Sequence, residues 1–557
     1  MKLKIISSLE KCFLNESAEQ KPELEKASCL KNELFHFQVC YQASNNNGSG
    51  YAYLSIESEI ADYINVQRIE PVPVQLAARP CSDDGFISKN SGLYPDVLQP
   101  LEENKRFAVA TNLRSLMVEV DPKGEVKPGI YPITFCFDFV EAYTNEIKGQ
   151  YKVTFNLEII DALLPEQDLK FTQWFHCDSL KCYYNTETFD DRHFEIIENF
   201  AKTAVKYGVN TLLTPVFTPA LDTYVGGERE TMQLVGVTLE NGKYSFDFTL
   251  LGRWVDMCNR VGIKNFEIAH FFTQWGAKAA PKIMATVDGV YKKIFGWETD
   301  AVSEEYAGFL RAFIPALLEY MKSLNGADKR CFFHISDEPN EKQLEGYLKA
   351  KAIVEPLLQG YPIIDALSSF DYYSSGAVKL PVVSTMHIDK FIENKVTDLW
   401  AYYCVSEDCN NLSNRFIAMP SFRNRILGTQ LYKYDIKGFL HWGYNFYFNQ
   451  FSYAFVNPFM NTDGEYFSPG GDTFSVYPGP DGSPWPSIRL LVFYDGIQDI
   501  SAYRLCEELY GKDYVMSILE DGIEPITFKN YPLNAEYLLN TREKINKAIS
   551  DYMKNKS

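Results

Sequence analysis

Two adjacent carboxylates, Asp337 and Glu338, end an apolar stretch in the segment KRCFFHISDEPN, residues 329–340. The stretch before them has the length and composition of a buried β-strand. Carboxyl groups held at the end of a strand are suited to acid–base chemistry. The residues that follow, PNEKQLEGYLKAK, predict a helix, so Asp337 could instead be the N-cap of that helix. The capping interpretation explains Glu338 less well, because a second carboxylate beside the first adds repulsion.

The bulk composition limits the possible partners. The chain has 557 residues, too many for one hydrophobic core, and we expect two or three domains. Its formal charge of −19 argues against a nucleic-acid partner, because an acidic protein does not neutralise phosphates. We expect no membrane insertion and a cytoplasmic location, since no apolar run reaches about 18 residues and the N-terminal segment lacks a secretory apolar core. The 12 cysteines are scattered without a C-x2-C pair, which predicts reduced thiols and no zinc site.

The N-terminal part, residues 1–165, has the pattern of a β domain. NELFHFQVCYQA and YAYLSIES alternate apolar and polar side chains over the length of a strand, and NNNGSG between them predicts a turn. Further strands follow in residues 115–139 and 149–160, with no long helix among them. We therefore expect an antiparallel β-sandwich in residues 1–165.

From residue 166 to residue 490, apolar strands alternate with helical patterns. The strands are expected at residues 169–178, 209–217, 263–272, 329–335, 361–370, 380–388, 397–405 and 437–447. Eight strands separated by helical segments predict a (β/α)8 TIM-like barrel, and residues 491–557 predict a helical segment packed on it. A doubly wound open sheet is the alternative, but no G-x-G-x-x-G follows the first strand.

In a (β/α)8 barrel the functional residues lie at the carboxyl ends of the strands. Besides the carboxylate pair, these ends carry Trp174, His270, Tyr372, Tyr373, Tyr402, Trp442 and Asn445. Aromatic faces stack on sugar rings, polar tips bind hydroxyl groups, and carboxylates supply acid chemistry. The set is what a carbohydrate pocket needs, although most of the aromatic residues in the chain are expected to be core.

Five of the seven histidines also fall near strand ends: His176, His270, His334, His387 and His441. They come from separate strands and lack the H-E-x-x-H spacing of a zinc site. We therefore interpret them as hydrogen-bonded pocket or core residues, and we expect no metal and no cofactor.

Three segments, taken in order, resemble a known family. They are HISDEP after a strand, GFLHWGYNFY on the last strand, and GGDTFSVYPGPDGSPWPSIRLLVFYDGIQDISAYRL. Together they resemble the domain of unknown function 4091 group, which includes glycoside hydrolase family 123. The resemblance covers most of the chain, because members also place a β-sandwich before the barrel, with a segment like KPGIYPITF in it.

The resemblance implies an exo-acting retaining β-N-acetylgalactosaminidase. Its substrate would be a small oligosaccharide with a terminal β-linked N-acetylhexosamine, such as a glycosphingolipid glycan. In this mechanism Glu338 would be the general acid/base, and Asp337 would orient the 2-acetamido group of the substrate, which acts as the nucleophile. Ionised Asp337 would also raise the pKa of Glu338 and keep it protonated.

A site of this kind also needs a donor for the acetamido oxygen and contacts for the sugar hydroxyls. The donor candidates are Tyr372, Tyr373, Tyr402 and Tyr403. Trp442 is expected to stack beneath the sugar, with Trp174 also at the pocket. The hydroxyls are assigned to Asn445, His270 and Asp472.

Two alternatives remain open at this point. In the first, Glu338 is still the acid/base, but a carboxylate from another strand, such as Asp371, is the nucleophile on a sugar without an acetamido group. In the second, the protein binds carbohydrate without catalysis. Retention of two adjacent carboxylates argues against the second, because a binding site has little use for a protonatable pair.

Overall fold

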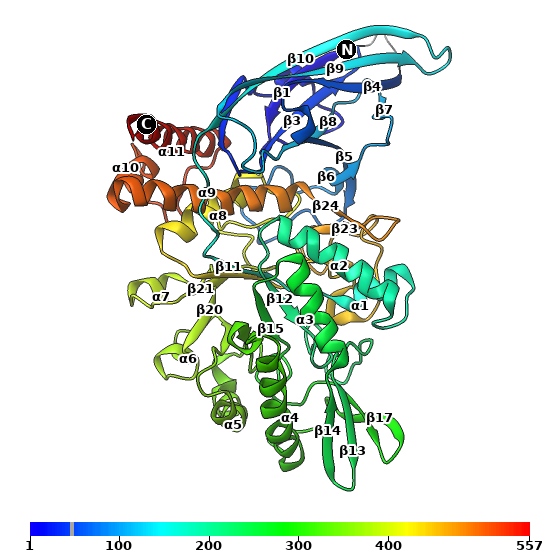
Figure 1. Ribbon diagram of the computed structural model, residues 1–557, viewed down its shortest axis with the longest axis vertical. Helices are drawn as coiled ribbons and strands as arrows, with labels where there is room; N and C mark the ends of the chain where they lie inside the picture. Colours follow the sequence, from blue (N-terminus) through cyan, green and yellow to red (C-terminus); the bar gives the residue numbers. More distant parts are fainter. Residues whose placement is uncertain (45–48, 557) are drawn as a thin grey trace.

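The computed structural model describes residues 1–44 and 49–556 and has three parts along its long axis (Figure 1). Stacked β-sheets lie at one end, a helix-covered parallel sheet fills the other, and helix α9 (Ile488–Tyr510) crosses between them. The turn expected at residues 45–50 lies mostly outside the described residues.

In the described part of the chain, residues 2–160 form two five-stranded sheets. The first sheet has the order β1 (Lys2–Ser7), β3 (Phe35–Gln42), β8 (Arg114–Val120), β5 (Ile64–Val74), β6 (Gly92–Pro100). The second has the order β2 (Lys26–Leu30), β10 (Ile147–Ile160), β9 (Gly129–Glu141), β4 (Gly50–Glu57), β7 (Arg106–Val109). Their inner faces share one core, in which the rings of Phe37 and Phe155 lie 4.5 Å apart. The expected β-rich N-terminal region is confirmed, with one parallel pairing between β2 and β10 among antiparallel ones.

A parallel sheet of eight strands follows, with each strand inside a range expected from the sequence. Its order is β18 (Cys331–Phe332), β15 (Asn265–Ile268), β12 (Thr211–Thr214), β11 (Lys170–Gln173), β22 (Gly438–His441), β21 (Trp400–Tyr402), β20 (Leu380–Ser384), β19 (Ile364–Leu367). A parallel bridge between Phe333 and Ile363 joins the two ends of this order. The sheet is therefore nearly closed, which is consistent with the expected barrel.

Helices connect consecutive strands of this sheet. They are α1 (Cys177–Tyr184), α2 (Asp191–Lys206), α3 (Thr249–Val261), α4 (Glu304–Ser323), α5 (Leu344–Val354), α6 (Asp371–Ser374), α7 (Asp389–Glu393) and α8 (Phe422–Lys433). Short 3-10 helices lie at η1 (Ala18–Gln20), η2 (Ala61–Tyr63), η3 (Ala327–Arg330), η4 (Glu341–Gln343), η5 (Glu355–Leu358) and η6 (Gln450–Ser452). The sequence explains both ends of α2. At its start, the Asp190 side chain accepts a hydrogen bond from the His193 amide. After its end, Gly208 takes a left-handed φ of 87°.

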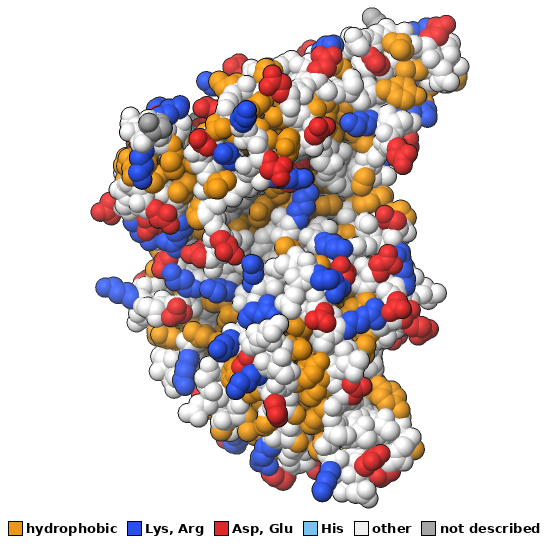
Figure 2. All heavy atoms as spheres, in the orientation of Figure 1, with side chains coloured by type: hydrophobic (Ala, Val, Ile, Leu, Met, Phe, Trp, Pro, Cys, Tyr) orange, Lys and Arg blue, Asp and Glu red, His pale blue; other side chains and the backbone are white. Residues whose placement is uncertain are grey.

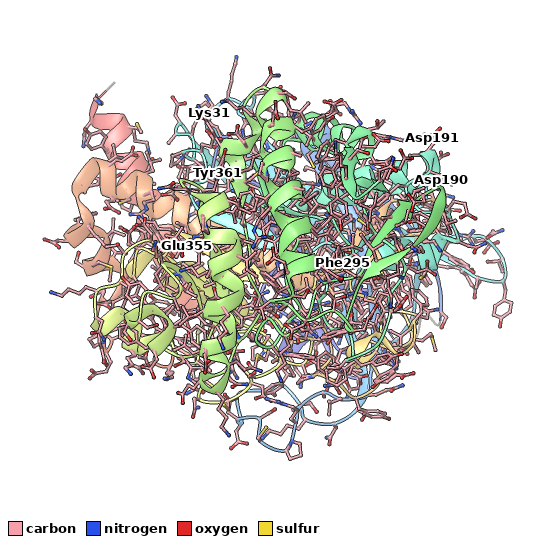
Figure 3. All side chains as sticks on the ribbon, turned by 90° about the horizontal axis from the view of Figure 1, so that it is seen from below. Lys31, Asp190, Asp191, Phe295, Glu355 and Tyr361 are labelled. Atoms are coloured by element: carbon pink, nitrogen blue, oxygen red, sulfur yellow. The ribbon has the colours of Figure 1, made fainter. Side chains whose placement is uncertain are left out.

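A second small sheet, which the sequence analysis did not predict, extends from the parallel sheet. It consists of β14 (Lys243–Asp247), β13 (Gly236–Glu240), β16 (Ile283–Val287) and β17 (Val290–Phe295). Seen from below (Figure 3), Phe295 at the end of β17 lies beside α4, where its ring contacts Tyr306 and Phe309. A further hairpin pairs β23 (Val476–Pro478) with β24 (Pro484–Pro486).

The expected helical C-terminal segment is confirmed by α9, α10 (Lys512–Leu519) and α11 (Ala535–Lys556). Arg489 near the start of α9 forms a buried bidentate ion pair with Asp96 of β6, with both N–O distances at 2.9 Å. This contact ties β6 of the sandwich to α9. The domain boundaries at residues 165 and 490 stay a prediction.

Charges of both signs are interspersed over the face in Figure 2, which shows no large area of one sign. Within the described residues, no helix combines the length and the apolarity needed to cross a membrane.

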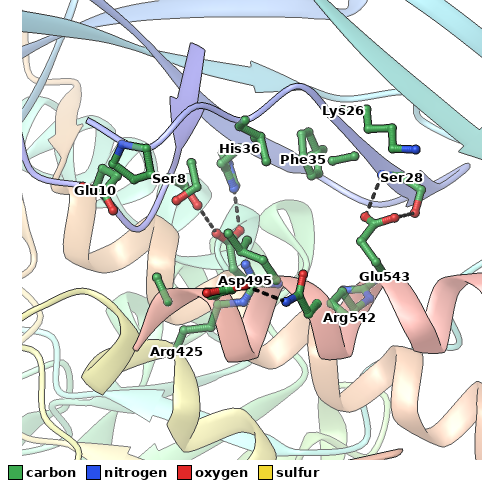
Figure 4. A pocket seen from close by; sticks show the side chains of 18 of the residues that line it. Ser8, Glu10, Lys26, Ser28, Phe35, His36, Arg425, Asp495, Arg542 and Glu543 are labelled. Atoms are coloured by element: carbon green, nitrogen blue, oxygen red, sulfur yellow. Dashed lines mark hydrogen bonds and ion pairs between the residues drawn. The ribbon is translucent and has the colours of Figure 1, made fainter. Parts of the chain in front are cut away.

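Buried charges join the sandwich to the helices beneath it, around a cavity of about 510 Å³ (Figure 4). His36 of β3 lies between two carboxylates, with its Nδ1 2.6 Å from Asp495 of α9 and its Nε2 3.3 Å from Glu119 of β8. Burial alone lowers the pKa of His36, but the two carboxylates outweigh it and raise the pKa to about 9. Burial raises the pKa of Glu119, yet His36 and Lys206 hold it at about 2. The histidine is therefore a cation that links the first sheet of the sandwich to α9.

Replacing His36 by Gln should leave Asp495 and Glu119 buried without their cation. We expect a loss on the order of 3 kcal/mol in the free energy of unfolding near neutral pH. Because the folded-state pKa is raised, the stabilisation is complete below the unfolded value of about 6.5 and fades as pH rises through about 9. Thermal melts of both proteins across this pH range measure the difference.

The matched control is His387→Gln, which removes an exposed histidine. A His36→Gln deficit that stays constant up to pH values well above 9 would contradict a stabilising imidazolium.

Candidate active site

A cavity of about 270 Å³ opens at the carboxyl ends of the parallel strands. Five residues expected at the site line it: Trp174, Asp337, Glu338, Tyr402 and Trp442. The volume is slightly below the roughly 300–1,000 Å³ of typical ligand pockets, so it suits one small ring rather than a chain.

The backbone explains how adjacent side chains can share this cavity. The strand before the pair is short, and Glu338 has a left-handed φ of 41°, which is uncommon for a residue with a Cβ. The Glu338 amide donates to the Ala366 carbonyl at 3.1 Å, and the Trp275 amide donates to the Asp337 carbonyl at 2.8 Å. Strand β19 and the loop after β15 thus hold the chain in a turn that presents both carboxyl groups to one cavity.

The capping interpretation of Asp337 is wrong. The cap of the next helical segment, η4, is Asn340, whose side chain accepts from the Lys342 amide at 3.1 Å. Gln343 returns a hydrogen bond by accepting from the Asn340 amide at 2.8 Å, which completes a capping box. Neither Asp337 nor Glu338 is used for helix initiation.

The two carboxyl groups favour protonation. Burial raises the pKa of Glu338, although a hydrogen bond from the Tyr402 hydroxyl to its Oε1 at 2.5 Å lowers it in part. Burial also raises the pKa of Asp337 well above its usual value, with the Glu338 charge as the next cause. The pKa of Glu338 is raised, but by burial and then by the charge of Asp472, and not by the charge of Asp337 that was expected from the sequence. Both causes disfavour a doubly ionised pair.

A buried charge cluster lies beneath the pair. His334 is 2.7 Å from Glu267 through Nε2 and 3.4 Å from Asp365 through Nδ1. Burial lowers the pKa of His334, but hydrogen bonds to these carboxylates raise it to about 9. The resulting imidazolium opposes the rise of the Asp337 pKa.

Two indole rings form fixed walls of the cavity. Trp174 donates its Nε1–H to Glu267 at 2.7 Å, and Trp442 donates its own to Asp472 at 3.1 Å. Asp472 is fully buried and does not line the cavity, so its position supports an orienting role behind Trp442 rather than the expected contact with hydroxyls. Rings held in this way are ready-made stacking surfaces.

Four other expected contact residues also lie off the cavity. His270 is buried against His334, with ring centroids 4.1 Å apart. Tyr372 donates its hydroxyl to the Asn340 carbonyl, while Tyr373 packs against Phe370 and Phe391. Asn445 bonds the backbone of His176 through both side-chain atoms. Their partners keep these side chains in the framework, so their positions do not support direct binding.

Five further side chains that line the cavity were given no specific role from the sequence, although Gln274 and Trp275 were expected at a strand end: Asp222, Gln274, Trp275, Phe451 and Phe467. Gln274 and Trp275 directly follow a strand end, which is a usable signal. Asp222 and Phe451 come from long loops that offer none. Burial raises the pKa of Asp222 to about 7, making it a third titratable carboxyl at the site.

No group of three or more His, Cys, Asp or Glu side chains among residues 1–44 and 49–556 is arranged to hold a metal ion. The polar side chains that line the cavity include carboxyl, phenol and indole groups.

Comparisons with known proteins agree with this chemistry. The catalytic domain of glycoside hydrolase 123 matches residues 174–506. A family 123 glycoside hydrolase from Clostridium perfringens, studied for glycolipid glycan hydrolysis, has the same fold at 14% identity and a TM-score of 0.74, covering 100% of this chain and 98% of that one. A family 5 mannosidase from Rhizomucor miehei is more distant, at 12% identity and a TM-score of 0.34 over 64% of this chain and 96% of that one. The curated proteins contain no match.

The Tyr402 hydroxyl should set the acidity of Glu338. Because its hydrogen bond lowers the pKa of Glu338, the Tyr402→Phe variant should have a higher one. If Glu338 acts as the acid in glycoside cleavage, the basic limb of the pH profile of kcat/KM moves to higher pH. Tyr403→Phe is the control, since that hydroxyl is buried without a hydrogen-bond partner in the described structure. An unmoved basic limb in Tyr402→Phe would show that Glu338 is not the group titrating there.

Proposed function

The chain belongs to glycoside hydrolase family 123, and we propose that it is an exo-acting retaining β-N-acetylgalactosaminidase that uses the acetamido group of its substrate as the nucleophile. One observation carries the proposal: two adjacent carboxyl groups line a single cavity with room for about one sugar. We also assign the nearly closed sheet to the (β/α)8 barrel class.

Adjacent carboxyl groups do not fit the conventional two-carboxylate mechanisms. Retaining enzymes with a protein nucleophile hold their carboxyl groups ~5–5.5 Å apart across the scissile bond, and inverting enzymes hold them further apart. Neighbouring residues on one turn instead serve neighbouring atoms of one sugar. Those atoms are the glycosidic oxygen and the acetamido nitrogen.

In the first step, Glu338 protonates the glycosidic oxygen while the acetamido carbonyl oxygen attacks the anomeric carbon. The bond to the leaving group breaks, and an oxazolinium ring forms on the sugar. Asp337 accepts the acetamido N–H and stabilises the positive charge that develops on the ring. The raised pKa of Glu338 supports its role as a proton donor.

In the second step, ionised Glu338 removes a proton from water, and the resulting oxygen attacks the anomeric carbon. The oxazolinium ring opens, and two inversions give net retention. The Tyr402 hydroxyl donates to Oε1 of Glu338, and this hydrogen bond stabilises the ionised form of Glu338 that the second step requires.

The terminal β-linked N-acetylgalactosamine of a glycolipid-type glycan is the proposed substrate. The similar enzyme from Clostridium perfringens hydrolyses glycolipid glycans, which supports this substrate class. The two indole walls suit the apolar face of a sugar.

A second candidate mechanism keeps Glu338 as the acid but uses a protein carboxylate as the nucleophile. Asp371, the residue first considered for that role, is exposed at the start of α6 and does not line the cavity. Asp222 does line it, so the alternative now rests on Asp222. An enzyme of this kind would cleave a sugar that carries a hydroxyl in place of the acetamido group.

Substitution of each carboxyl group separates these mechanisms. With 4-nitrophenyl N-acetyl-β-galactosaminide, we expect Asp337→Asn and Glu338→Gln each to lose about 10²-fold or more in kcat/KM, because one removes charge stabilisation and the other the acid/base. Glu338→Gln should lose even more on an oligosaccharide, since nitrophenolate leaves without full protonation and an alkoxide does not. The N-acetyl-β-glucosaminide, run beside it, tests the galacto preference.

Glu341→Gln is the matched control, because Glu341 is exposed three residues after the catalytic acid. If Asp222→Asn alone abolished turnover and Asp337→Asn did not, the conventional mechanism would replace this proposal. Full activity in both Asp337→Asn and Glu338→Gln would refute the assignment of the pair.

A further inference from the structure

The mouth of the cavity lies between the proposed acid and a loop after β22. Glu338 and Gln450 are the exposed residues of the lining, although protein surrounds the carboxyl group of Glu338, so we place the opening of the cavity beside these two residues. In the proposed function, on which this inference rests, Glu338 protonates the oxygen that leaves with the rest of the glycan. The leaving group must therefore pass out beside residues 450–453.

Two loops join to form the wall at this point. The Asp222 carboxylate accepts from the Phe451 amide at 3.2 Å, and the Asp222 carbonyl accepts from the Ser452 hydroxyl at 2.7 Å. The Tyr224 amide also donates to the Phe451 carbonyl at 3.2 Å. Phe451 and Ser452 both have left-handed φ values, 59° and 57°, in this arrangement. Hydrogen bonds between the two loops thus hold a strained segment in one place.

Aromatic rings continue from the cavity onto the outer surface of this wall. The Trp275 and Phe451 rings lie 5.5 Å apart inside the lining, and Phe451 lies 6.4 Å from Tyr453 outside it. Tyr453 stacks on Tyr224 at 4.4 Å with an interplanar angle of 13°. One face of the Tyr453 ring is thus braced, while the side chain as a whole remains 64% exposed.

We propose that Tyr453, braced by Tyr224, is the binding platform for the first sugar of the leaving group. The apolar face of that sugar stacks on the open face of the Tyr453 ring, as sugars do on exposed aromatic side chains. Exposed tyrosines occur elsewhere on the molecule, including a stacked pair at Tyr510 and Tyr514. What distinguishes Tyr453 is its continuity with the cavity on the side where the leaving group departs.

The test compares two substrates that differ only in what leaves. One is a trisaccharide with terminal β-N-acetylgalactosamine on lactose, and the other is methyl N-acetyl-β-galactosaminide, whose leaving group has no ring. In Tyr453→Ala we expect kcat/KM to fall about tenfold for the trisaccharide and to stay within about twofold for the methyl glycoside. Tyr453→Phe keeps the ring and should retain most of the activity on both. An aryl glycoside is avoided, because its ring could stack on Tyr453 itself.

Tyr514→Ala is the matched control, since it removes one ring of a stacked, exposed pair far along the chain on α10. Equal losses in Tyr453→Ala and Tyr514→Ala, or equal losses on both substrates, would overturn the platform while leaving the hydrolase function intact. Failure of the wild-type protein to cleave either glycoside would overturn the proposed function and the platform together.

Discussion

Consecutive side chains of an extended strand point to opposite faces, and Asp337 and Glu338 share a cavity because the chain leaves the extended conformation between them. A left-handed residue with a Cβ costs on the order of 1–3 kcal/mol, so neighbouring groups must hold it. The Ala366 carbonyl and the Trp275 amide do so directly. Ser336 extends the same support by donating to the Thr273 carbonyl at 2.8 Å. The turn after β18 is therefore held by the loop after β15 and by strand β19.

The buried charges beneath the cavity also hold its walls in place. Buried carboxylates are costly unless each has a partner, and Glu267 has three: Thr172, Trp174 and His334. This one side chain fixes an indole wall and the imidazolium that faces Asp337. Asp472 likewise fixes the second indole wall by accepting the hydrogen bond from Trp442. The site is thus organised before any sugar enters, which is how preorganised charge contributes most to catalysis.

Much of the fold could be predicted because short apolar runs between turn residues identify buried parallel strands. All eight were found that way, and their carboxyl ends pointed to five residues of the cavity. The hairpins of β13–β14 and β16–β17 were missed, although Asn241-Gly242 and Asp288-Gly289 at their tips have the left-handed φ values of tight hairpin turns. Which strand-end residue faces the cavity could not be predicted, because partners distant in sequence decide it. For example, the Tyr402 hydroxyl donates to the carboxyl group of Glu338, whereas the Tyr372 hydroxyl donates to the backbone carbonyl of Asn340.

The central claim is that the nucleophile belongs to the substrate. It is tested most directly by hydrolysis of an aryl β-galactosaminide series in which the acetamido methyl carries zero, one, two or three fluorines. Fluorine withdraws electrons from the carbonyl oxygen without blocking the cavity. If that oxygen attacks the anomeric carbon, kcat/KM falls steeply with each fluorine. A rate that does not depend on fluorination would assign the nucleophile to the protein and contradict the account.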